Sequence, residues 1–290
     1  NQIRICNSKG RLGMIKLFSW NDVLGASKDK NHLLSQFTKK GSALSIGGFD
    51  GPHLGHRELF QQVIDYKTKN NVVSGIVTFK FPPKAAKNPT DFTGELSTIK
   101  LKLEYFEDLG FDFVIVIDFS CDFSKMKGRD FLTFLKNSCS MQFLVAGSDF
   151  RCGYKLDTGI LQISEFAAQN GVSFNVVADC LFEDFRISST IIRKFVQNGK
   201  LEKASKLLGR PYALDLENAV YNVNEETSQL QIANSSVIQL LPPVGKYQVK
   251  VTLADTSTFS SVMYVESTLL RLEIPLEQKL QKLKKIEFSL

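Results

Sequence analysis

The sequence predicts an α/β fold in which a doubly wound parallel sheet of Rossmann-like type is followed by a small antiparallel β domain. Short apolar runs recur between residues 43 and 178, and stretches of about 10 to 15 residues with helical apolar spacing separate them. This alternation is typical of strands joined by right-handed helical crossovers. From residue 245 onward the pattern changes to the alternation of antiparallel strands.

The first strand and helix are expected within residues 41–65. Ala43–Ile46 is a short apolar run bounded by glycines, which is typical of a buried parallel strand. A glycine-rich turn follows this run. From Leu54 onward the apolar positions fall on one face of a helix: Leu59, Phe60, Val63 and Ile64. Strand, turn and helix together open a βαβ unit.

The remaining elements follow in chain order. Further strands are expected at Val72–Phe79, Asp112–Asp118, Gln142–Ala146 and Ser173–Ala178. Helices are expected at Ser97–Leu109, around Phe131–Leu135, at Ile160–Asn170, and from Ser188 or Ser189 to Gly199. Residues 15–40 are interpreted as peripheral, with a helix near Ser19–Leu24. The antiparallel domain is predicted from three alternating segments: Gly245–Leu253, Thr258–Val265 and Leu269–Ile274.

Length and composition indicate a soluble globular protein with one large domain or two ordinary ones, since 43% of the 290 residues are hydrophobic and 23% are charged. The net charge of +6 is spread among acidic residues, so no nucleic-acid partner is expected. Five scattered cysteines without a C-x-x-C pair favour a reduced, cytoplasmic setting. No signal-peptide core and no apolar run of about 18 residues occur, so no membrane partner is expected. Residues 1–13 are interpreted as a possible extension before Met14, and the protein is expected to be a monomer.

Residues 47–56, with the sequence GGFDGPHLGH, have the features of a polyphosphate site. Glycines at 47, 48 and 51 allow a tight turn and a close approach of a ligand to the backbone. The helix that follows presents unpaired N–H groups and the positive end of its dipole. Two of the three histidines, His53 and His56, stand three residues apart at the helix entrance, so both imidazoles are expected to face one anion.

A second candidate phosphate site is the segment RISSTIIR, residues 186–193. Ser188 or Ser189 is expected to cap a helix, and Arg193 lies one turn inside that helix. Hydroxyl and N–H groups at a helix start, with a guanidinium one turn on, can bind phosphate oxygens. The alternative is that the serines only start the helix and Arg193 is a surface charge.

These motifs resemble those of the bacterial bifunctional riboflavin kinase and FAD synthetase family, in its FMN adenylyltransferase part. The resemblance covers residues 42–212 and rests on four motifs in family order: G-G-F-D-G-P-H-L-G-H at 47–56, G-S-D-F-R-C-G at 147–153, I-S-S-T-I-I-R at 187–193 and L-G-R-P-Y at 208–212. Lys102 with Gly110 and Asp112 is similar to the family's K-x(7)-G-x-D. The implied domains are an FMN adenylyltransferase domain at 14–210 and a small β-barrel-like domain at 211–290.

The resemblance implies transfer of AMP from ATP to FMN, with Mg²⁺ accompanying ATP, and FAD and pyrophosphate as products. It implies catalytic roles for His53, His56 and Arg193. The implied ATP-binding residues are Gly47, Gly48, Phe49, Asp50, Gly51, His53, Gly55, His56, Ser188, Ser189, Thr190 and Arg193. The implied FMN-binding residues are Phe79, Pro83, Asp149, Phe150 and Arg151. No metal ligands are indicated.

Three departures from the family pattern bear on function. Residues 78–83 read TFKFPP where the family has T-F-x-P-H-P, and Cys152 replaces an aromatic residue. Residues 213–235 contain no glycine and lack the kinase signature G-R-x-x-G-F-P-T-A-N. The second domain is therefore interpreted as a degenerate kinase domain, without riboflavin kinase activity. Two alternatives are a related nucleotidyltransferase with another phosphate acceptor, and a flavin- or nucleotide-binding protein that is not an enzyme.

Overall fold

The computed structural model describes residues 15–81, 93–118, 121–183, 185–224, 229–275 and 282–289. The chain divides into two compact units. The first holds the described residues 15–49, 56–81 and 102–180. The second holds Asp50–Gly55, Thr93–Leu101 and the described residues from Leu181 onward.

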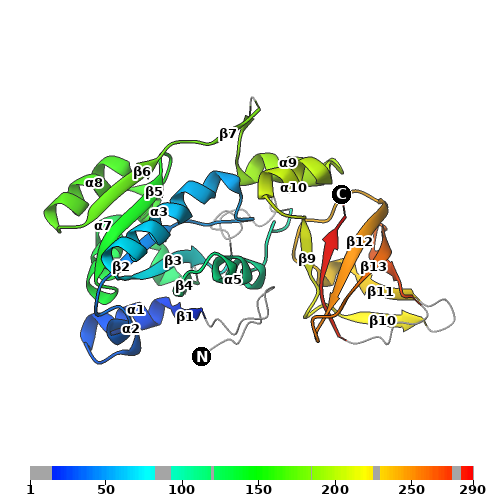
Figure 1. Ribbon diagram of the computed structural model, residues 1–290, viewed down its shortest axis with the longest axis horizontal. Helices are drawn as coiled ribbons and strands as arrows, with labels where there is room; N and C mark the ends of the chain where they lie inside the picture. The colour runs from blue at the N-terminus through cyan, green and yellow to red at the C-terminus, as the bar shows by residue number, and fades with distance from the viewer. Residues whose placement is uncertain are drawn as a thin grey trace. The chain divides into compact units, whose positions relative to one another are not determined.

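The first unit is built on a six-stranded sheet with the order β1-β4-β3-β2-β5-β6, in which all neighbouring strands are parallel (Figure 1). The strands are β1 (Lys16–Ser19), β2 (Ser42–Ile46), β3 (Val73–Phe79), β4 (Phe113–Ile117), β5 (Met141–Gly147) and β6 (Ser173–Val177). The predicted α/β class with a parallel sheet is confirmed. From β2 the chain proceeds to β3 and β4 on one side, and later to β5 and β6 on the other. The strand order therefore reverses between β2 and β5, which is where α/β sheets place a ligand crevice.

Helices accompany both faces of this sheet. The helices of this region are α1 (Trp20–Lys28), α2 (Leu33–Phe37), α3 (Leu54–Asn70), α5 (Ile99–Asp108), α6 (Cys121–Ser124), α7 (Gly128–Ser138) and α8 (Ile160–Gln169), with a 3-10 turn at Tyr154–Leu156. On one face, α1, α7 and α8 share a buried apolar cluster with Leu44 and Ile46 of β2. On the other face the rings of Phe60 (α3) and Phe106 (α5) pack 5.6 Å apart. This two-sided cover buries the central strands and leaves their carboxyl ends to the loops.

The interpretation of residues 15–40 as peripheral was wrong. β1 pairs with β4 as an edge strand of the sheet, and α1 contributes the buried side chains of Trp20 and Val23 to the core. Ser19 ends β1 and starts α1 through a capping box with Asp22, in which each side chain bonds the other's backbone N–H. The expected helix is therefore present, and the strand before it was missed.

The second unit contains α9 (Ser189–Gln197), α10 (Leu201–Leu208), a short β7–β8 pair (Leu181–Phe182 and Phe185–Arg186) and a seven-stranded antiparallel sheet. This sheet has the order β10-β11-β14-β13-β12-β15-β9. Its strands are β9 (Ala213–Asp215), β10 (Tyr221–Asn224), β11 (Gln229–Ala233), β12 (Gly245–Leu253), β13 (Thr258–Val265), β14 (Leu269–Glu273) and β15 (Leu283–Phe288), with a 3-10 turn at Asn234–Ser236. β12, β13 and β14 match the predicted segments. The other four strands were not predicted.

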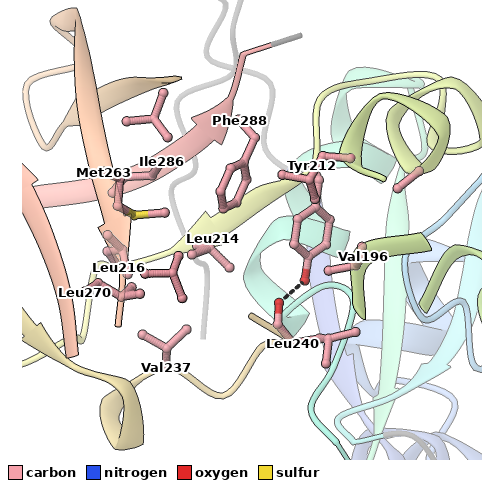
Figure 2. Close-up of a cluster of buried hydrophobic side chains, with 14 of the residues drawn as sticks. Val196, Tyr212, Leu214, Leu216, Val237, Leu240, Met263, Leu270, Ile286 and Phe288 are labelled. Atoms are coloured by element: carbon pink, nitrogen blue, oxygen red, sulfur yellow. Dashed lines mark hydrogen bonds between the residues drawn. The ribbon is translucent and has the colours of Figure 1, made fainter. Parts of the chain in front are cut away.

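One apolar core serves the whole second unit. Met263, Leu270 and Ile286 of the sheet belong to the same buried cluster as Val196 of α9 (Figure 2). Tyr212 is fully buried in it, and its hydroxyl donates a hydrogen bond to the carbonyl oxygen of Leu240 at 2.7 Å (Figure 2). Burial raises the pKa of this phenol, so it remains a donor at any physiological pH. The helices that follow residue 188 and the antiparallel sheet therefore form one packed body.

Gly75 provides a test of the close packing in the first sheet. It lies in the middle of β3 opposite Phe113 of β4, and a Cβ atom added there would lie 2.3 Å from Cζ of the Phe113 ring. We expect Gly75→Ala to lower the free energy of unfolding by about 1 to 3 kcal/mol, the range for overpacking a core. Thermal and urea denaturation would measure the loss.

Two further variants complete this test. Adding Phe113→Leu to Gly75→Ala should recover part of the loss, which a double-mutant cycle would show as a coupling energy. Gly245→Ala is the matched control, since a Cβ at this strand position meets its nearest neighbour only at 3.4 Å. Equal stabilities of the Gly75→Ala and wild-type proteins would contradict the packing described.

Candidate active site

The chain turns sharply directly after β2, at residues 47–49. The N–H of Gly47 still bonds the carbonyl of Val77 in β3 at 3.0 Å. Phe49 then adopts a left-handed backbone with φ of 44°, which places its ring over Gly47, so that a Cβ on Gly47 would lie 2.7 Å from that ring. Such a conformation costs a non-glycine residue free energy and persists only where the surroundings fix it. Here the ring of Phe49 is buried against Phe60, at 5.2 Å between centroids.

Two side chains hold the carbonyl group of Gly48. Thr78 donates from Oγ1 at 3.1 Å, and Lys102 donates from Nζ at 3.4 Å. The same ammonium group donates to the carbonyl of Phe79 at 3.0 Å, and the side chain of Lys102 is 0% exposed. Lys102 thus ties the ends of β2 and β3 together. A buried ammonium is stable only where such acceptors compensate for its lost hydration.

His56 lies in the first turn of α3, within the first unit. Its ring meets the Phe49 ring edge-on, with 5.0 Å between centroids, and packs at 5.9 Å from Phe60. These contacts fix the orientation of the imidazole. The turn at Phe49 therefore positions His56 as well as shaping the backbone.

In the second unit, the carboxylate of Asp50 is the centre of a hydrogen-bond network. Only 8% of Asp50 is exposed. Its Oδ1 accepts hydrogen bonds from the backbone N–H groups of Leu96 at 2.9 Å and Ser97 at 3.3 Å. Its Oδ2 accepts one from Nη2 of Arg193 at 2.5 Å, and Arg193 also donates from Nη1 to the carbonyl of Gly94.

The start of α9 is anchored to the same turn. Ser188 is the N-cap residue, since its side chain accepts a hydrogen bond from the N–H of Ile191 at 3.3 Å. Ser189 donates from Oγ to the backbone carbonyl of Asp50 at 2.7 Å. Thr190 is exposed, while Ile192 of the opposite helix face is buried. The serines therefore both start the helix and fix it to residue 50.

His53 is buried in the second unit with 4% exposure. Burial, together with the positive charges of Arg210 and Arg186, lowers its pKa from 6.5 to about 4. Arg210 also donates from Nη1 to the carbonyl of Pro52 at 2.5 Å. Its neighbour Gly209 has a left-handed backbone, and a Cβ there would lie 2.8 Å from Leu54. The L-G-R-P-Y motif thus supports the backbone on both sides of His53.

A cavity of about 320 Å³ opens in the first unit where β2, β3 and β5 end. Four phenylalanines, Phe79, Phe123, Phe131 and Phe150, form much of its wall. Its remaining lining residues are Ile46, Gly48, Ser124, Met126, Asp149, Arg151, Cys152, Gly153 and Leu156. The volume is within the range of ligand pockets. Burial and the charge of Asp157 raise the pKa of the Cys152 thiol to about 12, so this wall is uncharged there.

The structure groups the expected site residues as follows. Gly47, Gly48, Phe49 and His56 belong to the first unit, and Asp50, Gly51, His53, Gly55, Ser188, Ser189, Thr190 and Arg193 belong to the second. Phe79, Asp149, Phe150 and Arg151 line the one cavity of the first unit described above. Pro83 lies outside the described residues.

Sequence reasoning assigned no role to Lys102, Thr78 or Arg210, or to the cavity residues Phe123 and Phe131. Lys102 and Arg210 did appear within the family motifs, and this was the available signal. Thr78 likewise stands at the start of the segment compared with the family's T-F-x-P-H-P, which was its signal. The described residues hold no group of three or more His, Cys, Asp or Glu side chains that could bind a metal ion. Nor does any helix in the described ranges have the length and apolar character needed to cross a membrane.

A glycine turn and an aromatic cavity, both at the switch point of a parallel sheet, are features typical of nucleotide-binding α/β proteins. The comparison with protein families is more specific. The family model for FAD synthetase matches residues 35–191, which is more than half of the chain. The chain belongs to the FAD synthetase family, whose enzymes are nucleotidyltransferases.

Curated relatives agree with this assignment. A bifunctional riboflavin kinase/FMN adenylyltransferase from Buchnera aphidicola (subsp. Schizaphis graminum) is 32% identical over 216 residues, covering 73% of this chain and 69% of the relative. The proteins of the same name from Escherichia coli and Bacillus subtilis are 28% and 27% identical, covering 76% of this chain and 71% and 70% of the relatives. A crystal structure titled as a macrolide-efflux protein from Streptococcus pneumoniae has a TM-score of 0.73 at 19% identity, covering 86% of this chain and 85% of that one. This likeness supports the fold.

The depressed pKa of His53 predicts a pH dependence of stability. The folded pKa of about 4 lies below the unfolded value of about 6.5, so the unfolded chain binds the proton first as the pH falls. The contribution of neutral His53 is therefore complete above pH about 6.5 and is lost between about 6.5 and 4, by up to about 3 kcal/mol. His53→Gln should lose less stability than the wild type over this window. Urea denaturation at several pH values would measure both, and parallel pH profiles would contradict the assignment.

Proposed function

We propose that this protein transfers AMP from ATP to FMN, giving FAD and pyrophosphate. The observation that carries the proposal is that the two strands flanking the switch point, β2 and β5, lead respectively into the glycine turn and into the wall of the aromatic cavity. A glycine turn before a helix suits the phosphates of a nucleoside triphosphate, and a cavity lined by aromatic side chains suits the isoalloxazine ring of FMN. Family membership and the names of the relatives support the same reaction.

In the proposed reaction, an oxygen of the FMN phosphate attacks the α-phosphorus of ATP. A new P–O bond forms, the bond from the α-phosphorus to the β-phosphate oxygen breaks, and pyrophosphate leaves with the electron pair. No covalent enzyme intermediate or redox partner is required. Catalysis of phosphoryl-group transfer consists mostly of positioning and charge stabilisation. Mg²⁺ enters as part of the MgATP substrate, held mainly by the phosphates.

His53 and His56 are proposed to donate hydrogen bonds to the phosphates of ATP. His53 is neutral near pH 7, because its pKa is lowered to about 4, so it acts first as a neutral N–H donor. A nearby polyphosphate would raise that pKa and so favour the imidazolium as charge develops. Arg193 is proposed to bind the phosphates from a fixed position, because Asp50 and Gly94 hold its guanidinium. The hydroxyl and backbone N–H groups of Ser188, Ser189 and Thr190, at the start of α9, are proposed to bind further phosphate oxygens.

FMN is proposed to bind in the cavity, with its ring between the phenylalanine side chains. Arg151 and Asp149 lie on the wall of the cavity and provide its charged groups, and Phe79, the last residue of β3, is also part of the wall. A related enzyme with a small phosphate or phosphonate acceptor would have no use for four aromatic rings. This lining favours FMN over that alternative.

The first test is an assay for FAD with FMN and MgATP, using the histidines as probes. Wild-type protein should produce FAD, and His56→Ala should lower kcat/KM by about 10² or more, the scale for the loss of one fixed donor. His32→Ala is the matched control, since this third histidine caps α2 and is not part of either motif. Chromatography of the flavins measures the rates. The non-enzymatic alternative would be favoured if the wild type formed no FAD above a blank without protein.

We also propose that riboflavin kinase activity is absent. Residues 213–235 contain no glycine, whereas the family's kinase signature needs a glycine-rich loop that exposes backbone N–H groups to phosphate. With riboflavin and MgATP we therefore expect no FMN, under conditions in which FMN and MgATP give FAD. A bifunctional relative assayed in parallel would show that the conditions permit kinase activity. FMN formed from riboflavin by this chain would overturn the proposal.

A further inference from the structure

Within the second unit, residues 94–96 lie beside residues 238–240 of the antiparallel β region. The N–H of Glu95 donates to the carbonyl of Ile238 at 3.1 Å, and the N–H of Leu240 donates to the carbonyl of Glu95 at 2.8 Å. This is a parallel bridge between Glu95 and Gln239. Gly94 is needed for the approach, because a Cβ there would lie 2.8 Å from the backbone nitrogen of Leu240.

The side chain of Gln239 connects three backbone groups at this bridge. It is buried, with 3% exposure. Its Nε2 donates to the carbonyls of Ala213 at 2.7 Å and Leu96 at 3.3 Å, and its Oε1 accepts from the N–H of Asp215 at 2.6 Å. Both hydrogens of the amide and its oxygen are thus used. An apolar residue of the same size would leave all three backbone groups without these bonds.

Leu96 connects the hydrogen bonds of Gln239 to the turn that carries the proposed phosphate site. Its carbonyl is bonded by Gln239, and its N–H is one of the two that bind the carboxylate of Asp50. A Cβ on Gly51 would lie 2.8 Å from the Cβ of Leu96, so the two chain segments are in direct contact. Leu96 is therefore held between Gln239 on one side and the turn at Asp50 and Gly51 on the other.

A second set of side-chain contacts joins residues 98–100 to residues 215–217. Thr98 donates from Oγ1 to Oδ2 of Asp215 at 2.8 Å, and Lys100 forms an ion pair with Glu217 at 2.9 Å. The backbone N–H of Asp215 is the group that Gln239 binds. Residues 94–100 are thus fixed at both ends by residues 213–217 and 238–240.

We propose that Gln239 is a positioning residue for adenylyl transfer: it acts through Leu96 on Asp50, and so on the turn that binds ATP. The proposal rests on the function proposed above. It assigns the antiparallel β region, which lacks the kinase signature, a part in the transfer reaction. Gln239 itself touches no substrate.

The main test compares Gln239→Leu with Gln231→Leu, which changes an exposed glutamine of β11 in the same unit. The Gln239→Leu variant should raise KM for ATP and lower kcat, with kcat/KM for ATP reduced about tenfold or more, since small misplacements of positioning groups cost up to about 10². The Kd of FMN, measured by quenching of flavin fluorescence, should stay within about twofold, because the cavity is built from other residues. Gln231→Leu should match the wild type in all three quantities.

Gln239→Glu provides a second readout that does not depend on the first variant folding well. An ionised carboxylate still accepts from Asp215 but cannot donate to Leu96 or Ala213, whereas a protonated carboxyl can donate once. The ratio of Gln239→Glu to wild-type kcat/KM for ATP should therefore rise as the pH is lowered from about 8 to 6, since burial raises the pKa of a carboxyl group.

The outcomes separate the two proposals. A wild-type protein that makes no FAD overturns the proposed function, and this inference falls with it. The inference alone is overturned if the wild type is active and Gln239→Leu keeps the wild-type KM for ATP. In that case any fall in apparent kcat would reflect only a smaller fraction of active protein. A Gln239→Glu ratio that does not change with pH also overturns the inference while leaving the proposed function intact.

Discussion

The ion pair between Asp50 and Arg193 is the interaction on which the candidate site depends most. A carboxylate that is largely removed from water must receive hydrogen bonds in return, and Asp50 receives them from Arg193 and from two backbone N–H groups. Through these bonds three segments that are far apart in the sequence meet: the glycine turn, residues 94–97 and helix α9. Removing one partner of such a pair commonly costs about 3 to 5 kcal/mol, because the other charge stays buried. The conformation of the glycine turn at Asp50 therefore depends on residues that are distant in the sequence.

The core of the fold was readable from the sequence because its central strands are buried on both faces. β2, β3, β4 and β5 are such buried apolar runs, and each was predicted within a few residues. The edge strand β6 is largely exposed, and it was predicted from its run of apolar and β-branched residues. β1 was missed because it is four residues long and only Phe18 in it is buried. β15 was missed because its buried residues, Leu283, Ile286 and Phe288, do not alternate regularly, which matches a register shift opposite Thr252 and Leu253.

The candidate site was predicted in part, and the missing part has a physical explanation. The glycines, His53, His56 and Arg193 stand in recognisable motifs, so they could be named in advance. Lys102 and Gln239 act through bonds to backbone carbonyls of residues at least 23 positions away in the sequence. Such bonds need only a donor at the right place in three dimensions, and they leave no local pattern. Arg193 shows the same limit: its motif predicted a phosphate ligand, while its strong bond to Asp50 appears only in the folded chain.

The placement of Tyr212 has a consequence for any attempt to shorten the chain. Tyr212 is the final residue of the last family motif, and it is buried in the core of the second unit, where its hydroxyl donates a hydrogen bond to the carbonyl of Leu240. A fragment that ended at residue 212 would keep all four family motifs but lose most of the core on which α9 and α10 pack. Removing the antiparallel sheet would therefore expose the apolar faces of α9 and α10, including Ile192 and Val196, whatever chemistry the sheet itself performs.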